Sequence, residues 1–107
     1  MKRKVVIQPR AIEDIKRNAL WWADRHSAEQ ALEWYDDAID SLNALAEFAE
    51  SHSLSVENGD FSFEIRDCLF GLGKRKSHRG IFTIDGDVVR VLTVRRSSER
   101  PFRPDEA

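Results

Sequence analysis

Apolar residues recur along the first half of the chain at the spacing of helix turns. The first such stripe consists of Ile12, Ile15, Ala19 and Trp22. It predicts a helix over residues 9–24, and Pro9 suits the first turn of that helix because its missing N–H is no loss there. A short β-branched run at residues 5–7 comes just before and predicts a strand.

A second apolar stripe predicts a long amphipathic helix over about residues 28–49. Its members are Ala31, Tyr35, Ala38, Leu42, Leu45 and Ala49. Ser27 and Gln30 fit a capping box, in which the Ser27 hydroxyl accepts a backbone N–H and Gln30 returns the bond. The link at Arg25 and His26 is so short that the two helices must run antiparallel.

The second half of the chain reads as strands. Phe61, Phe63 and Ile65 alternate with polar residues, which predicts a strand over residues 61–70. Two further β-rich runs meet at Asp85-Gly86, a strong hairpin signal in which both residues are expected at positive φ. We therefore expect one α+β domain over residues 1–107, ordered βααβββ, with a helical hairpin packed on a small antiparallel sheet.

Charge is distributed unevenly along the chain. The net charge is −2, but residues 1–10 carry +4, residues 11–60 carry −9 and residues 61–107 carry +3. The asymmetry favours an anionic partner at the basic end. The basic side chains that surround the predicted hairpin are Lys74, Arg75, Lys76, Arg79, Arg90, Arg95 and Arg96.

Several classes of protein are not favoured by this sequence. The lone Cys68 lies in an apolar context and reads as a small core residue in a reducing compartment. No Cys/His cluster has zinc spacing, and we expect neither a metal nor a cofactor. The basic start lacks the apolar run of a signal peptide, and no segment approaches membrane-spanning length. The expected location is cytoplasmic, with no membrane partner.

The chain resembles the RelE/ParE toxins of bacterial type II toxin–antitoxin systems, also described as plasmid stabilisation proteins. The likeness rests on Phe63-Glu64-Ile65-Arg66 followed by Leu69-Phe70-Gly71, on the run from Arg79 to Val91, and on Val91-Leu92-Thr93-Val94-Arg95. It extends over nearly the whole chain. The family implies growth inhibition restrained by a cognate antitoxin in a hetero-oligomer. Its members act either as ribosome-dependent mRNA endonucleases or on DNA gyrase.

The resemblance also indicates which residues form the functional surface. Arg79 falls on the third-strand arginine of the family, and a guanidinium can bind a phosphate in bidentate fashion. Lys74, Arg75 and Lys76 lie near the basic residues that precede that strand, and Arg95 and Arg96 lie beside the place of a later arginine. We expect these six residues to contact the target or nucleic acid. We expect Arg79→Ala to lower toxicity and to leave thermal stability nearly unchanged; unfolding of this variant would show that Arg79 is structural.

One departure from the family pattern bears on the choice between mRNA cleavage and gyrase inhibition. The catalytic tyrosine of the ribonucleases, near the C-terminus, has no equivalent, because the only tyrosine is Tyr35 in the second helix. His78 is the one candidate for proton transfer and, with Arg79, the candidate catalytic set. Gyrase inhibition needs no catalytic set and is slightly favoured over mRNA cleavage. A non-toxic nucleic-acid-binding module is the third alternative.

The antitoxin is expected to be a small protein whose disordered C-terminal segment folds on the toxin as a helix or strand and brings acidic side chains to the basic rim of the predicted hairpin. Trp21 and Trp34 fall off the main apolar stripes and are candidates to flank the groove that receives it. Trp22 continues a stripe and is expected in the core. Phe61, Phe63 and Phe82 are expected in the core as strand residues.

Overall fold

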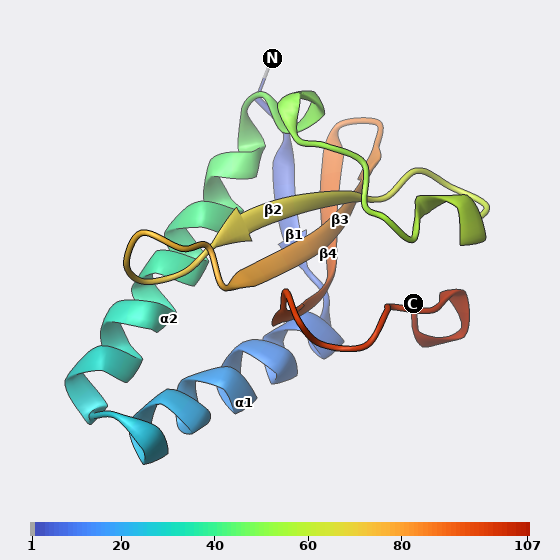
Figure 1. The fold of residues 1–107 in the computed structure, drawn as a ribbon. Coiled ribbons are helices and arrows are strands. Elements are labelled where there is room, and N and C mark those ends of the chain that lie inside the picture. The colour runs from blue at the N-terminus through green and yellow to red at the C-terminus, as the bar shows by residue number, and fades with distance from the viewer. Residues whose placement is uncertain (1) are drawn as a thin grey trace.

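The computed structural model describes residues 2–107 and has the element order that the sequence predicts. The helices and strands are β1 (Lys4–Ile7), α1 (Pro9–Arg25), α2 (Ala28–Asn43), β2 (Arg66–Phe70), β3 (His78–Asp85) and β4 (Val88–Arg96). Figure 1 shows the helical hairpin beside a single sheet, which confirms the α+β class. No helix within residues 2–107 is long and apolar enough to cross a membrane.

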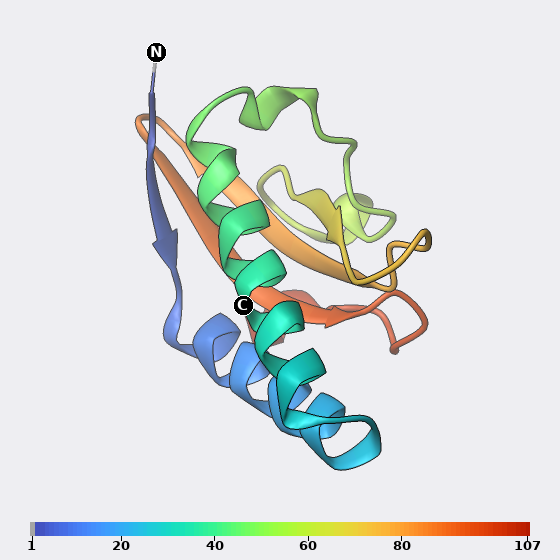
Figure 2. The ribbon, with the colours of Figure 1, turned by 90° about the vertical axis from the view of Figure 1, so that its left-hand side faces the viewer.

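The sheet has the strand order β1-β4-β3-β2. The three later strands pair antiparallel, as expected, whereas β1 pairs in parallel with β4. The whole helical hairpin follows β1 along the chain and covers one face of the sheet, with α2 crossing in front of the strands in Figure 2. The opposite face is left to the loops and the C-terminal tail.

The main core lies between the helices and the sheet. Its fully buried members include Trp34, Ala38 and Leu42 of α2 and Phe82 and Val91 of the sheet. Removal of the apolar surface of these side chains from water is the dominant favourable contribution to the free energy of folding. Cys68 also lies here, 3% exposed, and burial raises the pKa of its thiol to about 11. The thiol is therefore protonated at neutral pH, as expected of a structural cysteine.

A second, smaller core lies on the other face of the sheet. It consists of buried Ile65, Ile81 and Phe102, with Phe61 and Leu92 packed against it. The rings of Phe61 and Phe102 stack with their centroids 5.5 Å apart. Through Phe102 the C-terminal tail is attached to this face, where Arg10 from the first turn of α1 also lies over the Phe102 ring (5.9 Å to its centre).

Three predicted boundaries were wrong. The second helix ends at Asn43 and not at Ala49. Two 3₁₀ turns, Ala44–Ala46 and Ala49–Ser51, follow it, separated by the extended Glu47 and the left-handed Phe48 (φ 59°). Leu45 and Ala49 are nevertheless buried, so the apolar stripe is real although the helix is shorter. The hairpin turn consists of Gly86 and Asp87, and only Gly86 has positive φ (59°).

The second strand begins at Arg66 and not near residue 61. The backbone N–H of Ile65 donates to Asn58 Oδ1 (2.8 Å) and its carbonyl accepts the Ser55 N–H (2.9 Å), so the chain just before β2 bonds to the preceding loop and not to another strand of the sheet. Phe61 packs in the small core from a loop, and Phe63 is 42% exposed. Of the three phenylalanines expected in strands, only Phe82 lies in one and is fully buried.

Candidate functional site

The basic loop between β2 and β3 is exposed, as the sequence predicts. Lys74, Arg75 and Lys76 all face solvent, and so does Arg96 at the end of β4. The loop is held against β4 by a hydrogen bond from the Ser97 N–H to the Ser77 carbonyl (2.8 Å). Four of the six residues expected at a target-binding surface are therefore accessible and adjacent.

Arg79 is not part of that exposed surface. Its guanidinium donates to both carboxylate oxygens of Glu57, at 2.8 and 2.5 Å, and its Nη1 also lies 3.3 Å from Asp67 Oδ1. Arg79 is 6% exposed and Glu57 5% exposed. The hydrogen bonds from Arg79 lower the pKa of Glu57 to about 2, and the same bonds raise the pKa of Arg79.

The expectation that Arg79 belongs to the accessible contact surface was wrong, because its carboxylate partners are supplied by segments distant in the sequence. Glu57 comes from the loop before β2 and also accepts the backbone N–H of Phe102 (2.9 Å). Asp67 lies on β2 and accepts the Ser55 hydroxyl (2.5 Å). The Arg79 guanidinium thus holds the loop before β2, and through Glu57 the tail, on the face of the sheet opposite the helices. A phosphate could reach this guanidinium only by displacing Glu57.

Arg95 is also withdrawn from solvent. It lies directly across from Arg79 on β4 and is 2% exposed. Its guanidinium sits 5.1 Å from the centre of the Phe102 ring and donates to the Arg100 carbonyl (2.6 Å). Burial lowers the pKa of Arg95. Its role in the structure is to support the C-terminal tail, contrary to the expectation of an exposed contact residue.

His78 lies in the core and not on the surface, with 2% exposure. The Trp34 indole N–H donates to its Nδ1 (3.3 Å), and its Nε2 lies 3.1 Å from Asn18 Oδ1. Since an indole nitrogen can only donate, Nδ1 must carry a lone pair, and the imidazole is neutral with its proton on Nε2. Burial lowers the pKa of His78 to about 4, with the Arg96 charge contributing.

This network continues through residues that the sequence did not single out. The Asn18 amide donates to the Asp14 carbonyl (2.8 Å), and the Asp14 carboxylate accepts the Thr93 hydroxyl (2.5 Å) and the Val94 N–H (3.1 Å). Asp14 and Asn18 lie on the buried face of α1 with Ile15, whereas Ile12 is 41% exposed. Two polar residues four apart beside an apolar stripe were the available signal.

The tryptophans differ in exposure. Trp34 is fully buried between α2 and β3, so the expectation that it flanks a surface groove was wrong. Trp22 is partly buried against the core, close to expectation. Trp21 is partly exposed, and the guanidinium carbons of Arg25 and Arg96 lie 5.1 and 5.6 Å from its ring centre.

An apolar groove runs along the outer side of the helical hairpin. It has a volume of about 570 Å³ and is lined by Lys16, Ala19, Leu20, Ala23, Ala28, Ala31, Leu32 and Tyr35. Leu20 and Leu32 are 71% and 65% exposed. A neighbouring hollow of about 230 Å³ shares Lys16 and Tyr35 and extends the groove towards Ile7 at the end of β1. Neither Trp21 nor Trp34 lines it.

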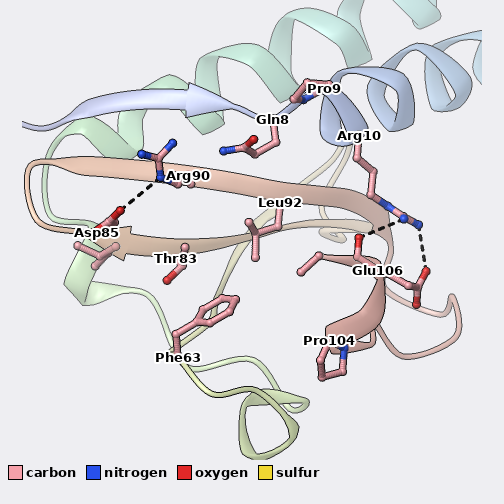
Figure 3. A pocket seen from close by; sticks show the side chains of 12 residues that line it. Gln8, Pro9, Arg10, Phe63, Thr83, Asp85, Arg90, Leu92, Pro104 and Glu106 are labelled. Carbon is pink, nitrogen blue, oxygen red and sulfur yellow. Dashed lines mark hydrogen bonds and ion pairs between the residues drawn. The ribbon is translucent and has the colours of Figure 1, made fainter.

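A larger hollow of about 700 Å³ lies on the face of the sheet opposite the helices, between the β3–β4 hairpin and the C-terminal tail (Figure 3). Its ionic groups are already paired, Arg90 with Asp85 (3.4 Å) and Arg10 with Glu106 (3.0 Å). Thr83 in its wall donates to the Glu64 carbonyl (2.8 Å). The hollow holds no uncompensated charge that would define a ligand. No group of three His, Cys, Asp or Glu side chains within residues 2–107 could hold a metal ion.

Comparison with known proteins agrees with this fold. A family model described as the ParE toxin of type II toxin-antitoxin system, parDE, matches residues 5–101. The match covers most of the sequence, and the chain belongs to this family of toxins. No curated protein matches the chain.

A solved structure from P. aeruginosa, titled "Chromosomal ParDE TA system", has the same fold. It superposes with a TM-score of 0.70 at 15% sequence identity, covering 89% of this chain and 96% of that chain. At this identity the likeness concerns the arrangement of the helices and strands alone. It agrees with a helical hairpin on a four-stranded sheet.

Replacement of Arg79 with Ala is expected to destabilise the protein by about 3–5 kcal/mol, because Glu57 would remain buried without its counterion. Arg90→Ala is the matched control: Arg90 lies on the neighbouring strand in an exposed pair with Asp85, and its loss should cost less than about 1 kcal/mol. Urea unfolding of both variants measures the difference. Equal stability of the two variants would show that the Arg79 pair contributes nothing.

The neutral state of His78 predicts a dependence of stability on pH. Between pH 6.5 and 4 the unfolded chain binds a proton at this residue and the folded chain does not. The free energy of unfolding should therefore fall as pH is lowered through this range, by roughly 2–3 kcal/mol. The variant His78→Gln should lack this contribution to the slope of the unfolding free energy against pH. Urea titrations at several pH values measure that slope. An unchanged slope in the variant would refute the assignment.

Proposed function

We propose that this chain is a growth-inhibiting toxin that acts by binding DNA gyrase and is neutralised by a cognate antitoxin. Membership of the ParE family supports the toxin role. The observation that favours binding over catalysis is the burial of the two residues, His78 and Arg79, that ribonuclease chemistry would have to use.

Cleavage of RNA needs a group that exchanges a proton near neutral pH at the reacting atoms. His78 has a pKa of about 4 and both of its ring nitrogens are hydrogen-bonded inside the core. Arg79 is neutralised by Glu57 and would have to leave a buried ion pair to stabilise a phosphorane-like transition state. Tyr35 lines the apolar groove on the helices, away from the basic loop. A toxin that only binds its target requires none of these groups.

The apolar groove on the helical hairpin is the site that we propose for the antitoxin. Family membership implies such a partner, and the groove exposes Leu20 and Leu32, which a monomeric protein rarely leaves in water without a reason. A groove between two helices fits the apolar face of a third, amphipathic helix. Because residues 11–60 carry a net charge of −9, the flanks of that helix should be basic.

Expression of the wild-type chain in bacteria is expected to stop growth and to leave a reporter plasmid relaxed, because gyrase no longer supercoils it. Substitution of Lys74, Arg75 and Lys76 by Ser should restore viable counts by at least about tenfold, since these exposed cations form the accessible part of the predicted contact surface. Viable counts and topoisomer gels after induction measure both effects. Arrest with normal supercoiling and fragmented mRNA would instead establish the endonuclease alternative.

Leu20→Glu should abolish neutralisation by the antitoxin and leave growth inhibition intact, because a carboxylate in the groove would be desolvated by the incoming apolar helix. Leu69→Glu is the control, since Leu69 is 55% exposed on β2, outside the groove. Viable counts with and without co-expressed cognate antitoxin measure the difference. Neutralisation of both variants would exclude the groove as the docking site.

A further inference from the structure

Some of the Lys and Arg side chains of the chain form an ion pair with a carboxylate, and others do not. Of its 17 Lys and Arg residues, nine lie within ion-pair distance of Asp or Glu in the structure of residues 2–107. Eight have no such partner there. Five of these eight form what we call the cationic face: Arg25, Lys74, Arg75, Lys76 and Arg96.

Three separate elements bring the cationic face together. The loop between β2 and β3, the loop after β4 and the tip of the helical hairpin all project to the same side of the molecule in Figure 2. Arg96 is the cross-strand neighbour of His78, and the Ser97 hydroxyl lies 3.5 Å from the Lys76 carbonyl. Arg96 and Arg25 both stack on Trp21, which links the end of β4 to the end of α1.

The acids at the edge of this surface do not neutralise it. Asp37 accepts the Gly71 N–H (3.1 Å) and Glu99 accepts the Arg96 N–H (3.3 Å), and neither carboxylate lies within ion-pair distance of a cation of this face. Asp24 is the chain neighbour of Arg25 and is exposed. None of the five cations lies within ion-pair distance of a carboxylate in the structure of residues 2–107, although the total charge of the protein is negative.

The aromatic residue on this face does not offer a stacking platform for bases. The Trp21 ring already contacts two guanidinium groups and lies edge-on to Trp22, with ring centroids 5.8 Å apart. Recognition of single strands depends on aromatic faces that receive unstacked bases. The cationic face instead presents only charge, and this arrangement fits the regularly spaced phosphates of a duplex.

We propose that the cationic face binds the phosphate backbone of double-stranded DNA without sequence preference. The acidic outer faces of the helices would be repelled by the same polyanion, so the protein should approach DNA in one orientation. The preference for DNA over duplex RNA rests on the proposed function, because gyrase acts on DNA.

The test is the fluorescence anisotropy of a labelled 20-base-pair DNA of mixed sequence, titrated with purified protein between 50 and 300 mM NaCl. With five phosphate contacts the slope of log affinity against log salt should be as steep as about −4.5. The variant Lys74→Ser/Arg75→Ser/Lys76→Ser should lose about 100-fold in affinity at 100 mM NaCl, and its slope should be shallower by about 2.7.

The matched control is Lys2→Ser/Lys4→Ser/Arg103→Ser, which removes the three remaining cations without a carboxylate partner and changes the net charge equally. Its affinity should change less than about threefold, and thermal melts should show that both variants are folded. Absence of binding by the wild type at 50 mM NaCl, or equal losses in the two variants, would overturn the proposal. Tighter binding of a duplex RNA of the same sequence would overturn the assignment to DNA.

This assay contains neither gyrase nor cells, so its outcome is separate from that of the proposed function. Inhibition of gyrase by a protein that does not bind DNA would overturn this inference and leave the proposed function standing. DNA binding by a protein that does not inhibit gyrase would overturn the proposed function and leave this inference standing.

Discussion

The pair formed by Arg79 and Glu57 determines what the face of the sheet opposite the helices can do. The guanidinium joins the central strand β3 to the loop before β2, and Glu57 extends the connection to the tail through the Phe102 N–H. With Phe102 fixed, the small core of Ile65, Ile81 and Phe102 can close, and Arg95 is covered. The arginine that was expected from the sequence to contact phosphate is the anchor of the surrounding structure, and its charge is neutralised within the chain.

The surface that remains accessible to partners has an apolar part and a cationic part. The outer side of the helical hairpin offers an apolar groove set in an acidic half of the chain, and the cationic face offers unpaired positive charge from two loops and a helix end. A protein helix and a polyanion would therefore meet different sides of the molecule. If the cationic face also contacts gyrase, the antitoxin and the target would occupy separate surfaces, and neutralisation need not be simple competition for one site.

The sequence predicts the element order, the helical hairpin and the exposed basic loop, because periodicity, capping and turn residues act over a few positions. It does not predict which charges are buried. Arg79 and Glu57 are 22 residues apart, and nothing local indicates that a loop carboxylate reaches the third strand. The polar network of Asp14, Asn18 and His78 was missed for the same reason, and Trp34 was placed on the surface because its neighbours in space come from β2 and β3.

A toxin that acts on gyrase by binding alone should inhibit supercoiling and leave RNA uncleaved. The most direct measurement is the supercoiling of relaxed plasmid by purified gyrase with increasing amounts of the purified chain, run beside ribosomes translating a defined mRNA. The expected result is loss of supercoiling at stoichiometric toxin, with the mRNA intact. Unimpaired supercoiling together with cleavage of the mRNA would contradict it, and would require that the buried His78 or Arg79 become available on the ribosome.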